Sequence, residues 1–227
     1  MASFRQLVTD IGGNMELEQA IHERRSIRKY NDRPVEKEII MRIIEAGTWA
    51  PSACNVQGWK FIVINDVDII RTIVKMGAAT FLNSTKQAIM VLYDNQTDNL
   101  EYNDYIQSAS ACIQNMLLEA HSLGIGTCWV NNLPTKSRLQ KLLNIPKQYS
   151  PIALISLGYY DQQINKRPRK CEVEENISYN TFDFNVEKKK NSFKLGLKRF
   201  ARKIYKHLPF KNTLLRVVGK LEKKFDN

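Results

Sequence analysis

Residues 102–132 read YNDYIQSASACIQNMLLEAHSLGIGTCWVNN, and no other stretch does more to decide the fold. Apolar side chains recur at helical spacing along most of it, which predicts about six turns of helix with a wide buried face. Gly124 and Gly126 end this helix, and the residues that follow predict a strand over 127–130. A long helix joined by a sharp turn to a strand indicates a sheet with the helix packed against it.

Shorter elements are predicted on either side of this stretch. The other strands are expected over short apolar runs, which are Trp59–Ile64, Ala88–Tyr93 and Pro151–Tyr159. Helices are expected where apolar residues keep helical spacing, which is over Met15–Arg25, Val35–Thr48, Asp66–Ala79 and Thr135–Leu143. Strands that alternate with helices predict an α+β fold, a sandwich in which helices flank one central sheet. We place this domain at residues 15–180, between an N-terminal arm, 1–14, and a C-terminal extension, 181–227.

The composition favours a globular domain with ordinary thiols. The chain has 227 residues, of which 43% are hydrophobic, and this is enough to bury one core. Its four cysteines lie far apart without a C-x-x-C pair, which argues against a zinc site, an iron–sulfur cluster or a redox dithiol. The three histidines do not cluster, and we expect neither a metal site nor a catalytic acid or base. Because no run of about 18 apolar residues and no signal-like start is present, we expect a cytoplasmic protein.

The positive charge of the chain is concentrated at one end. Residues 186–227 hold fourteen Lys/Arg and three Asp/Glu, which equals the whole net charge of +11, and residues 1–185 hold twenty of each sign. Apolar residues recur among these cations at helical spacing, which predicts amphipathic helices in the C-terminal extension. Such helices suit an anionic membrane surface or an acidic partner, and the alternative is that they pack on the protein itself. Nucleic acid is not expected, because no nucleic-acid-reading motif accompanies the charge.

The residues after the first predicted helix form a candidate phosphate site. Arg24, Ser26 and Arg28 alternate along the chain, and an extended stretch puts alternate side chains on one side. Two guanidinium groups and a hydroxyl that face one point suit a phosphate, because arginine pairs bidentately with phosphate oxygens. The alternative is a solvated basic turn, and these residues alone do not decide between the two.

Three further segments carry polar residues in patterns that are informative only together. In the loop Pro51–Gly58, the amides of Asn55 and Gln57 offer the donors and acceptors that the edge of a pyrimidine-like ring requires. The glycines in LGIGTCWVNN follow a helix, which excludes a dinucleotide-binding fingerprint. Residues 166–170, KRPRK, lie just past the last predicted strand.

In this order, the four segments resemble the nitroreductase family of flavoproteins over roughly residues 15–177. They read RRSIR, PSACNVQGW, AHSLGIGTCW and GYYDQQINKRPRK, and the joint match is specific although each part alone is weak. Two departures stand out. Gly58 replaces a proline that is usual in the family, and Asn131-Asn132 replace an acidic residue or glycine followed by glycine.

The resemblance implies an FMN cofactor at the interface of a homodimer. The FMN phosphate and ribityl chain would then be held by Arg24, Ser26, Arg28, Arg167 and Arg169. Arg25 would lie beside the pyrimidine side of the ring. The loop from the partner subunit would contribute Pro51, Ser52, Asn55 and Gln57, and the backbone near the flavin N5 would come from Trp129, Val130 and Asn131.

The resemblance also implies a reductase. NADH or NADPH would deliver hydride to the flavin N5, and a small oxidant such as a nitroaromatic or a quinone would then replace it in a ping-pong cycle. The alternative is a non-enzymatic or altered-chemistry flavin-fold protein that its basic tail recruits to a membrane or partner. The fold does not choose the substrate.

Overall fold

The computed structural model describes residues 15–97, 99–162 and 168–184, together with residues 196 and 200. The described residues fall into two units, divided after Gln162, and each unit is described by itself. The predicted arm at residues 1–14 and the predicted amphipathic helices of the extension lie outside the described residues. Among the described residues, no helix is long and apolar enough to cross a membrane.

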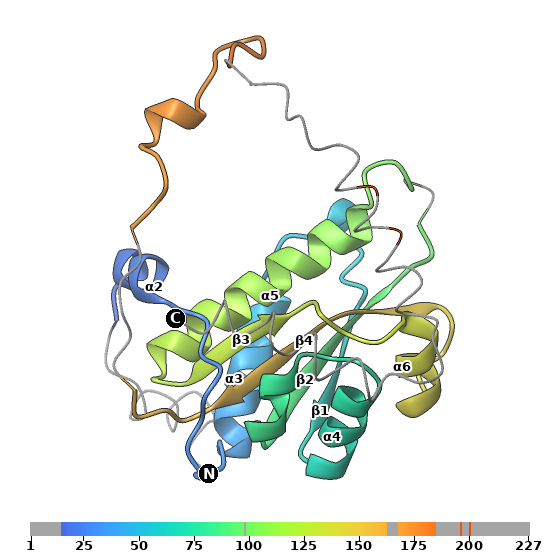
Figure 1. The fold of residues 1–227 in the computed structure, drawn as a ribbon. Coiled ribbons are helices and arrows are strands. Elements are labelled where there is room, and N and C mark those ends of the chain that lie inside the picture. Colours follow the sequence, from blue (N-terminus) through green and yellow to red (C-terminus); the bar gives the residue numbers. More distant parts are fainter. Residues whose placement is uncertain (1–14, 98, 163–167, 185–195, 197–199, 201–227) are drawn as a thin grey trace, which may run out of the picture. The chain divides into compact units, whose positions relative to one another are not determined.

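The first unit is built on a sheet whose strands run antiparallel to their neighbours (Figure 1). The strand order is β1-β2-β4-β3. The strands are β1 Trp59–Ile64, β2 Gln87–Asp94, β3 Gly126–Val130 and β4 Tyr149–Gly158. Beyond β3, Ser26 forms a single parallel bridge to Thr127. The expected α+β sandwich with a central sheet is confirmed, and each expected strand lies within two residues of its predicted bounds.

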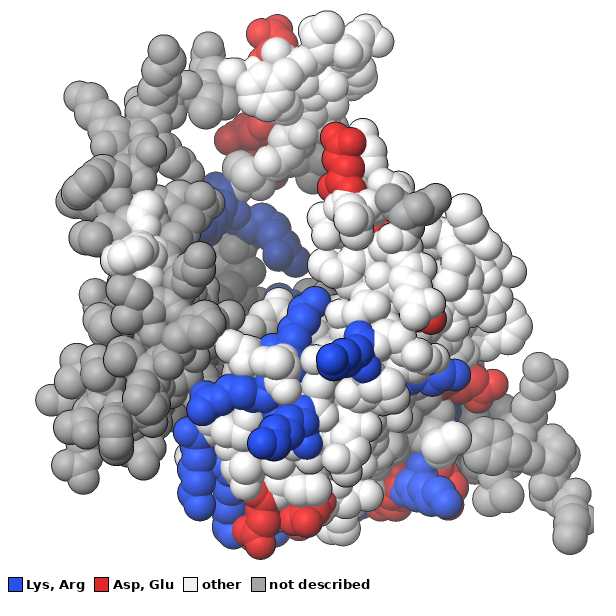
Figure 2. Space-filling view, turned by 90° about the vertical axis from the view of Figure 1, so that its right-hand side faces the viewer, with Lys and Arg blue, Asp and Glu red and all other residues white. Residues whose placement is uncertain are grey.

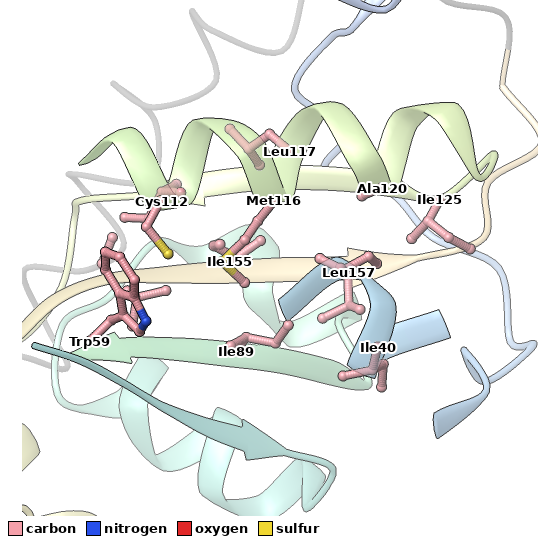
Figure 3. Packing of buried hydrophobic residues seen from close by; sticks show 14 of the residues in the cluster. Ile40, Trp59, Ile89, Cys112, Met116, Leu117, Ala120, Ile125, Ile155 and Leu157 are labelled. Carbon is pink, nitrogen blue, oxygen red and sulfur yellow. The ribbon is translucent and has the colours of Figure 1, made fainter. Parts of the chain in front are cut away.

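The long helix α5, Asp104–Ser122, covers one face of the sheet together with α3, Lys37–Thr48 (Figure 1). Met116 of α5 points toward Ile155 of the sheet in a core that excludes water (Figure 3). The two helices pack closely at Gly47, where an added Cβ would lie 2.6 Å from Met116 Cγ. Burial of this apolar face explains why the helical periodicity of residues 105–123 was the clearest signal in the sequence.

The opposite face of the sheet is covered by three shorter elements. These are α4 Val67–Lys75, the 3₁₀ turn η2 Thr80–Ser84 and α6 Lys136–Leu142. Ile70, Ile73 and Leu82 are completely buried there against Met90 and Leu154 of the sheet. Helices on both faces of one sheet make the two-sided core of the sandwich.

Helix ends were predicted less well than helix positions. The expected helix Asp66–Ala79 stops at Lys75, because Gly77 adopts a left-handed φ of 109° that no helix continues through. Asp66 caps this helix as expected, since its Oδ1 accepts the Asp68 amide at 2.8 Å. The expected helix Met15–Arg25 is also shorter, and α2 spans Leu17–Glu23.

Candidate functional site

The stretch from Arg24 to Arg28 lies extended beside strand β3. The Ile27 amide donates to the Thr127 carbonyl at 2.9 Å, next to the bridge formed by Ser26. The Ile27 side chain is buried, whereas Ser26 and Arg28 are exposed. Because side chains alternate along an extended chain, Arg24, Ser26 and Arg28 share the side opposite to Ile27.

These three side chains lie in the neighbourhood of the Cys128 thiol on β3. Burial raises the pKa of Cys128, and the neighbouring groups oppose this effect. The charge of Arg28, a hydrogen bond from Ser26 and the charge of Arg24 lower this pKa. We call Arg24, Ser26, Arg28 and Cys128 the cradle. Two guanidinium groups and a hydroxyl therefore lie on the same side of the extended stretch, and such a set of donors suits a phosphate.

Tyr30 fixes the cradle segment to the sheet. Its hydroxyl donates to the Ile27 carbonyl at 2.6 Å and lies 2.7 Å from Ser156 Oγ on β4. Burial raises the pKa of Tyr30 well above its ordinary value, so the hydroxyl stays protonated. The ring fits here because Gly158 lacks a side chain, whose Cβ would lie 2.9 Å from the Tyr30 ring. The sequence did not identify Tyr30, since no local pattern links it to a residue 126 positions away.

Arg25 points away from the cradle. Its Nη1 donates to the carbonyls of His22 and Arg24 at 2.7 and 2.8 Å, so it satisfies the C-terminal carbonyls of α2. His121 of α5 lies near this end of the helix, and burial followed by the charge of Arg24 lowers its pKa. Arg25 therefore serves the end of a helix in this structure, and a place beside a flavin ring stays a prediction.

The loop Pro51–Gln57 is held in a strained backbone conformation. Cys54, Asn55 and Gln57 have φ values of 49°, 56° and 51°, in the left-handed region that residues other than glycine seldom adopt. Such conformations persist only where the surroundings enforce them, and they cluster at functional sites. Asn55 and Gln57 are exposed, so the strain presents two amide side chains at the surface.

Hydrogen bonds hold this loop in shape. Gln57 Nε2 donates to Asn55 Oδ1 at 2.8 Å, and the Gln57 amide donates to Ser52 Oγ at 3.0 Å. The Ala53 amide donates to Ser108 Oγ at 3.1 Å, which anchors the loop to α5. The loop is thus organised before any ligand binds, and Ser108 is a support that the sequence did not reveal.

Gly58, where the family usually has proline, closes this loop tightly against β2. An added Cβ would lie 2.9 Å from Tyr93 Cε1 and 3.1 Å from Asp94 Cβ. The Gly58 carbonyl accepts the Asp94 amide at 2.9 Å. In this chain the absence of a side chain lets the loop and strand β2 approach closely.

The end of β3 orients the residues that follow it. Trp129 Nε1 donates to Asn131 Oδ1 at 2.9 Å, which fixes the Asn131 side chain. The side chain of Val130 is buried, so only its backbone is available to a ligand. The Asn132 carbonyl accepts the Ala79 amide at 3.1 Å and ties this segment to the residues before η2.

The second arginine group predicted for the phosphate follows Gln162 in the chain. Arg169 is an exposed residue of the second unit, and Arg167 lies outside the described residues. Their predicted contribution to a phosphate site stays a prediction. Among the described residues, no three His, Cys, Asp or Glu side chains are placed to hold a metal ion.

Comparisons with known proteins agree with the motifs. The model of the Nitroreductase family matches residues 21–96 and 76–159. The chain is 40% identical to an Archaeoglobus fulgidus protein named "Putative NADH dehydrogenase/NAD(P)H nitroreductase", over 61% of this chain and 82% of that protein.

Solved structures show the same fold. A crystal structure from Parabacteroides distasonis with the same protein name superposes with a TM-score of 0.65 at 33% identity, over 74% of this chain and all of that one. The FMN-dependent nitroreductase of Clostridium difficile gives a TM-score of 0.63 at 29% identity, over 72% of this chain and 98% of that one. Since sequence and fold both match over most of the relatives' length, this chain belongs to the Nitroreductase family.

Proposed function

We propose that this protein is an FMN-dependent oxidoreductase that takes hydride from NADH or NADPH and reduces a small oxidant such as a nitroaromatic or a quinone. The observation that carries the proposal is the extended stretch beside β3, which puts Arg24, Ser26 and Arg28 on one side of the chain. Relatives whose names include NAD(P)H nitroreductase and FMN-dependent nitroreductase support the same chemistry.

The residues of the cradle fit the phosphate of FMN. Arg24 and Arg28 supply charge-assisted donors, and Ser26 supplies a hydroxyl donor. Arg28 Cζ also lies 5.9 Å from the ring centroid of Phe81, a contact that limits the freedom of the guanidinium. A cradle that is ordered in advance loses little conformational entropy on binding. Arg167 and Arg169 would complete it.

The loop Pro51–Gln57 fits the ring of a flavin bound by a second copy of the chain. Trp49 precedes this loop with 78% of its surface exposed, and Val56 within it is 61% exposed. Large apolar side chains with this exposure are typical of contact surfaces between proteins. We therefore propose a homodimer in which Ser52, Asn55 and Gln57 reach the partner's flavin.

Bound FMN would supply the redox chemistry, since its N5 accepts a hydride and the reduced ring passes electrons to a second substrate. The chain would bind and orient the cofactor. The cradle neutralises the phosphate, the loop hydrogen-bonds the polar edge of the ring, and the backbone from Trp129 to Asn131 lines the ring. Asn131, held by the Trp129 indole, would place a neutral amide at a position where an acidic residue or glycine is common in the family.

Flavin selectivity and anaerobic reduction test this proposal. Replacing Arg28 with Ala should weaken FMN binding by at least about tenfold, because one charge-assisted bond contributes roughly 1.5–3 kcal/mol. Riboflavin, which lacks the phosphate, should bind equally to both proteins. Flavin absorbance should bleach when NADH or NADPH is added without oxygen. A protein that binds FMN yet stays oxidised with an excess of both nucleotides would instead be the non-enzymatic flavin-fold alternative.

The charge of the tail supports a second, separate proposal, that residues 186–227 attach a cytoplasmic enzyme to an anionic membrane or an acidic partner. Fourteen Lys/Arg stand against three acids in this segment, with Phe193, Leu197 and Phe200 among them at helical spacing. Flotation with phosphatidylserine vesicles should separate the full chain from a truncation at Val186. Equal flotation of the two proteins contradicts the proposal.

A further inference from the structure

Helix α6 and the residues after it, up to residue 160, carry only basic charged side chains. Lys136, Arg138 and Lys141 of α6 are exposed, as is Lys147. Between residues 105 and 160 the sequence holds one acid, Glu119. Glu119 forms an ion pair with Arg42 of α3, in the layer on the other face of the sheet. The cations of α6 therefore have no acidic neighbour within their own stretch of chain.

The C-terminal end of helix α4 adjoins this positive surface, while Asp66 and Asp68 lie at the other end of this helix. Arg138 Nη1 lies 3.5 Å from the Met76 carbonyl at the end of α4, which makes the two helices neighbours. Lys75 in the last turn of α4 is exposed, and so is Arg71, which pairs with Asp68 at 3.1 Å. We call the whole set the basic face, and it consists of Arg71, Lys75, Lys136, Arg138, Lys141 and Lys147. Figure 2 shows Lys and Arg side chains gathered on this side of the molecule, with acidic side chains toward its lower edge.

The basic face is a local feature and not a result of overall basicity. Residues 1–185 carry twenty Lys/Arg and twenty Asp/Glu. The surplus of cations at Lys136, Arg138, Lys141 and Lys147 is therefore offset by acids elsewhere in residues 1–185. An electrically polarised domain turns its positive side toward an anionic surface.

The chemistry of the face favours an extended polyanion over a folded protein partner. Protein interfaces are rich in aromatic residues and methionine and poor in lysine. Four of the six residues of the basic face are lysines, and no large exposed hydrophobic residue of the described chain belongs to α4 or α6. The apolar residues that accompany the cations of residues 186–227 suit lipid better than nucleic acid.

We propose that the basic face is a docking surface for an anionic lipid bilayer, which sets the orientation of the folded domain on the membrane. This inference rests on the second part of the proposed function, the membrane contact of the tail. Each Lys or Arg near an anionic surface strengthens binding roughly fivefold, and the attraction fades beyond about 8–10 Å. Arg71 contributes less than the others, because Asp68 already pairs with it.

A pair of double variants of the full chain tests the face separately from the tail. The face variant, Lys136→Glu/Arg138→Glu, reverses two charges in the first turn of α6. Because the helix dipole favours acidic side chains in a first turn, the change should not destabilise the helix. Lys37→Glu/Lys170→Glu is the matched control, because it changes net charge equally and Lys37 opens α3. Binding is measured by sedimentation with phosphatidylcholine vesicles, with and without phosphatidylserine.

The face variant should bind phosphatidylserine vesicles roughly 30-fold less tightly or weaker still, whereas the control should bind as the unmodified chain does. Equal losses in both variants would mean that net charge alone matters and would overturn the proposal. If the face variant binds these vesicles as tightly as the unmodified chain does, the tail is the only membrane contact and the proposal is overturned. If the unmodified chain does not bind these vesicles, the proposals for the tail and for the face are both overturned.

Two other outcomes would assign the face to a different ligand. Tighter binding to a short DNA duplex than to vesicles, lost in the face variant, would assign the face to nucleic acid. A raised KM for NADPH in the face variant alone would assign it to the coenzyme phosphate.

Discussion

The hydroxyl oxygens of Tyr30 and Ser156 lie 2.7 Å apart, and their hydrogen bond joins the segment that carries the cradle to the central strand β4. The same Tyr30 hydroxyl donates to the Ile27 carbonyl. One side chain thus fixes the position of the backbone between Ser26 and Arg28.

Replacing Tyr30 with Phe should loosen this segment. The change leaves the Ile27 carbonyl and the Ser156 hydroxyl without this partner, which costs about 1–3 kcal/mol of unfolding free energy. Urea denaturation measures the loss. FMN should lose more affinity than riboflavin, because the displaced groups are those that hold the phosphate. Tyr179→Phe, at a tyrosine that is 82% exposed, is the control and should leave both measurements unchanged.

The thiols should differ in reactivity. Burial raises the pKa of Cys112 to about 12, and it also raises the pKa of Cys128, so neither forms the reactive thiolate near neutral pH. Cys54 is exposed in the strained loop. A chromogenic disulfide reagent at pH 7.5 should label Cys54 at least about 100-fold faster than Cys128 in the folded protein. Rapid labelling of Cys128 without denaturant would contradict the burial of its thiol.

Gly47→Ala should destabilise the protein although alanine is the better helix former. The new Cβ would lie 2.6 Å from Met116 Cγ and 2.9 Å from Cys112 Sγ. Overpacking of this kind costs about 1–3 kcal/mol, which exceeds the roughly 1 kcal/mol gained from helix propensity.

A double-mutant cycle identifies the cause of that loss. In a Met116→Ala background the contact to Cγ is absent, so Gly47→Ala should cost less there than in the unmodified chain. Equal costs in both backgrounds would show that Met116 does not limit the approach of α3 to α5.

His121 should make stability depend on pH. Burial, and then the charge of Arg24, lowers its pKa in the folded state, so the unfolded chain takes up a proton that the folded chain resists. Stability is therefore fully present above the ordinary histidine pKa of about 6.5 and declines as pH falls below it. His121→Gln should flatten this decline in urea titrations between roughly pH 7 and 5. His22→Gln, at an exposed histidine, should keep the original slope.

The sequence predicted what depends on local periodicity. The helical spacing in residues 105–123 located α5, and the alternation of Arg24, Ser26 and Arg28 predicted a shared side, with which the extended backbone agrees. The family and the fold that the motifs suggested are those that the comparisons show. The contacts to the flavin stay a prediction.

Features that depend on distant contacts were not predictable. Tyr30 and Ser156 are 126 residues apart, and Ala53 and Ser108 are 55 apart, so no periodic pattern joins them. Arg25 forms local contacts that the sequence analysis did not predict, because its Nη1 donates to the carbonyls of His22 and Arg24. Its predicted place beside the flavin ring stays a prediction. The composition also did not predict the basic face, because acids elsewhere in residues 1–185 balance its positive charge.

The bridge between Ser26 and Thr127 has one more consequence. Strand β3 ends the sheet, and an open edge strand offers unpaired backbone groups to the strands of other molecules. The extended cradle segment occupies part of that edge through the Ile27 amide. A chain shortened past Ile27 should expose β3 as a template for aggregation, so the residues proposed to hold the phosphate should also protect the edge of the sheet.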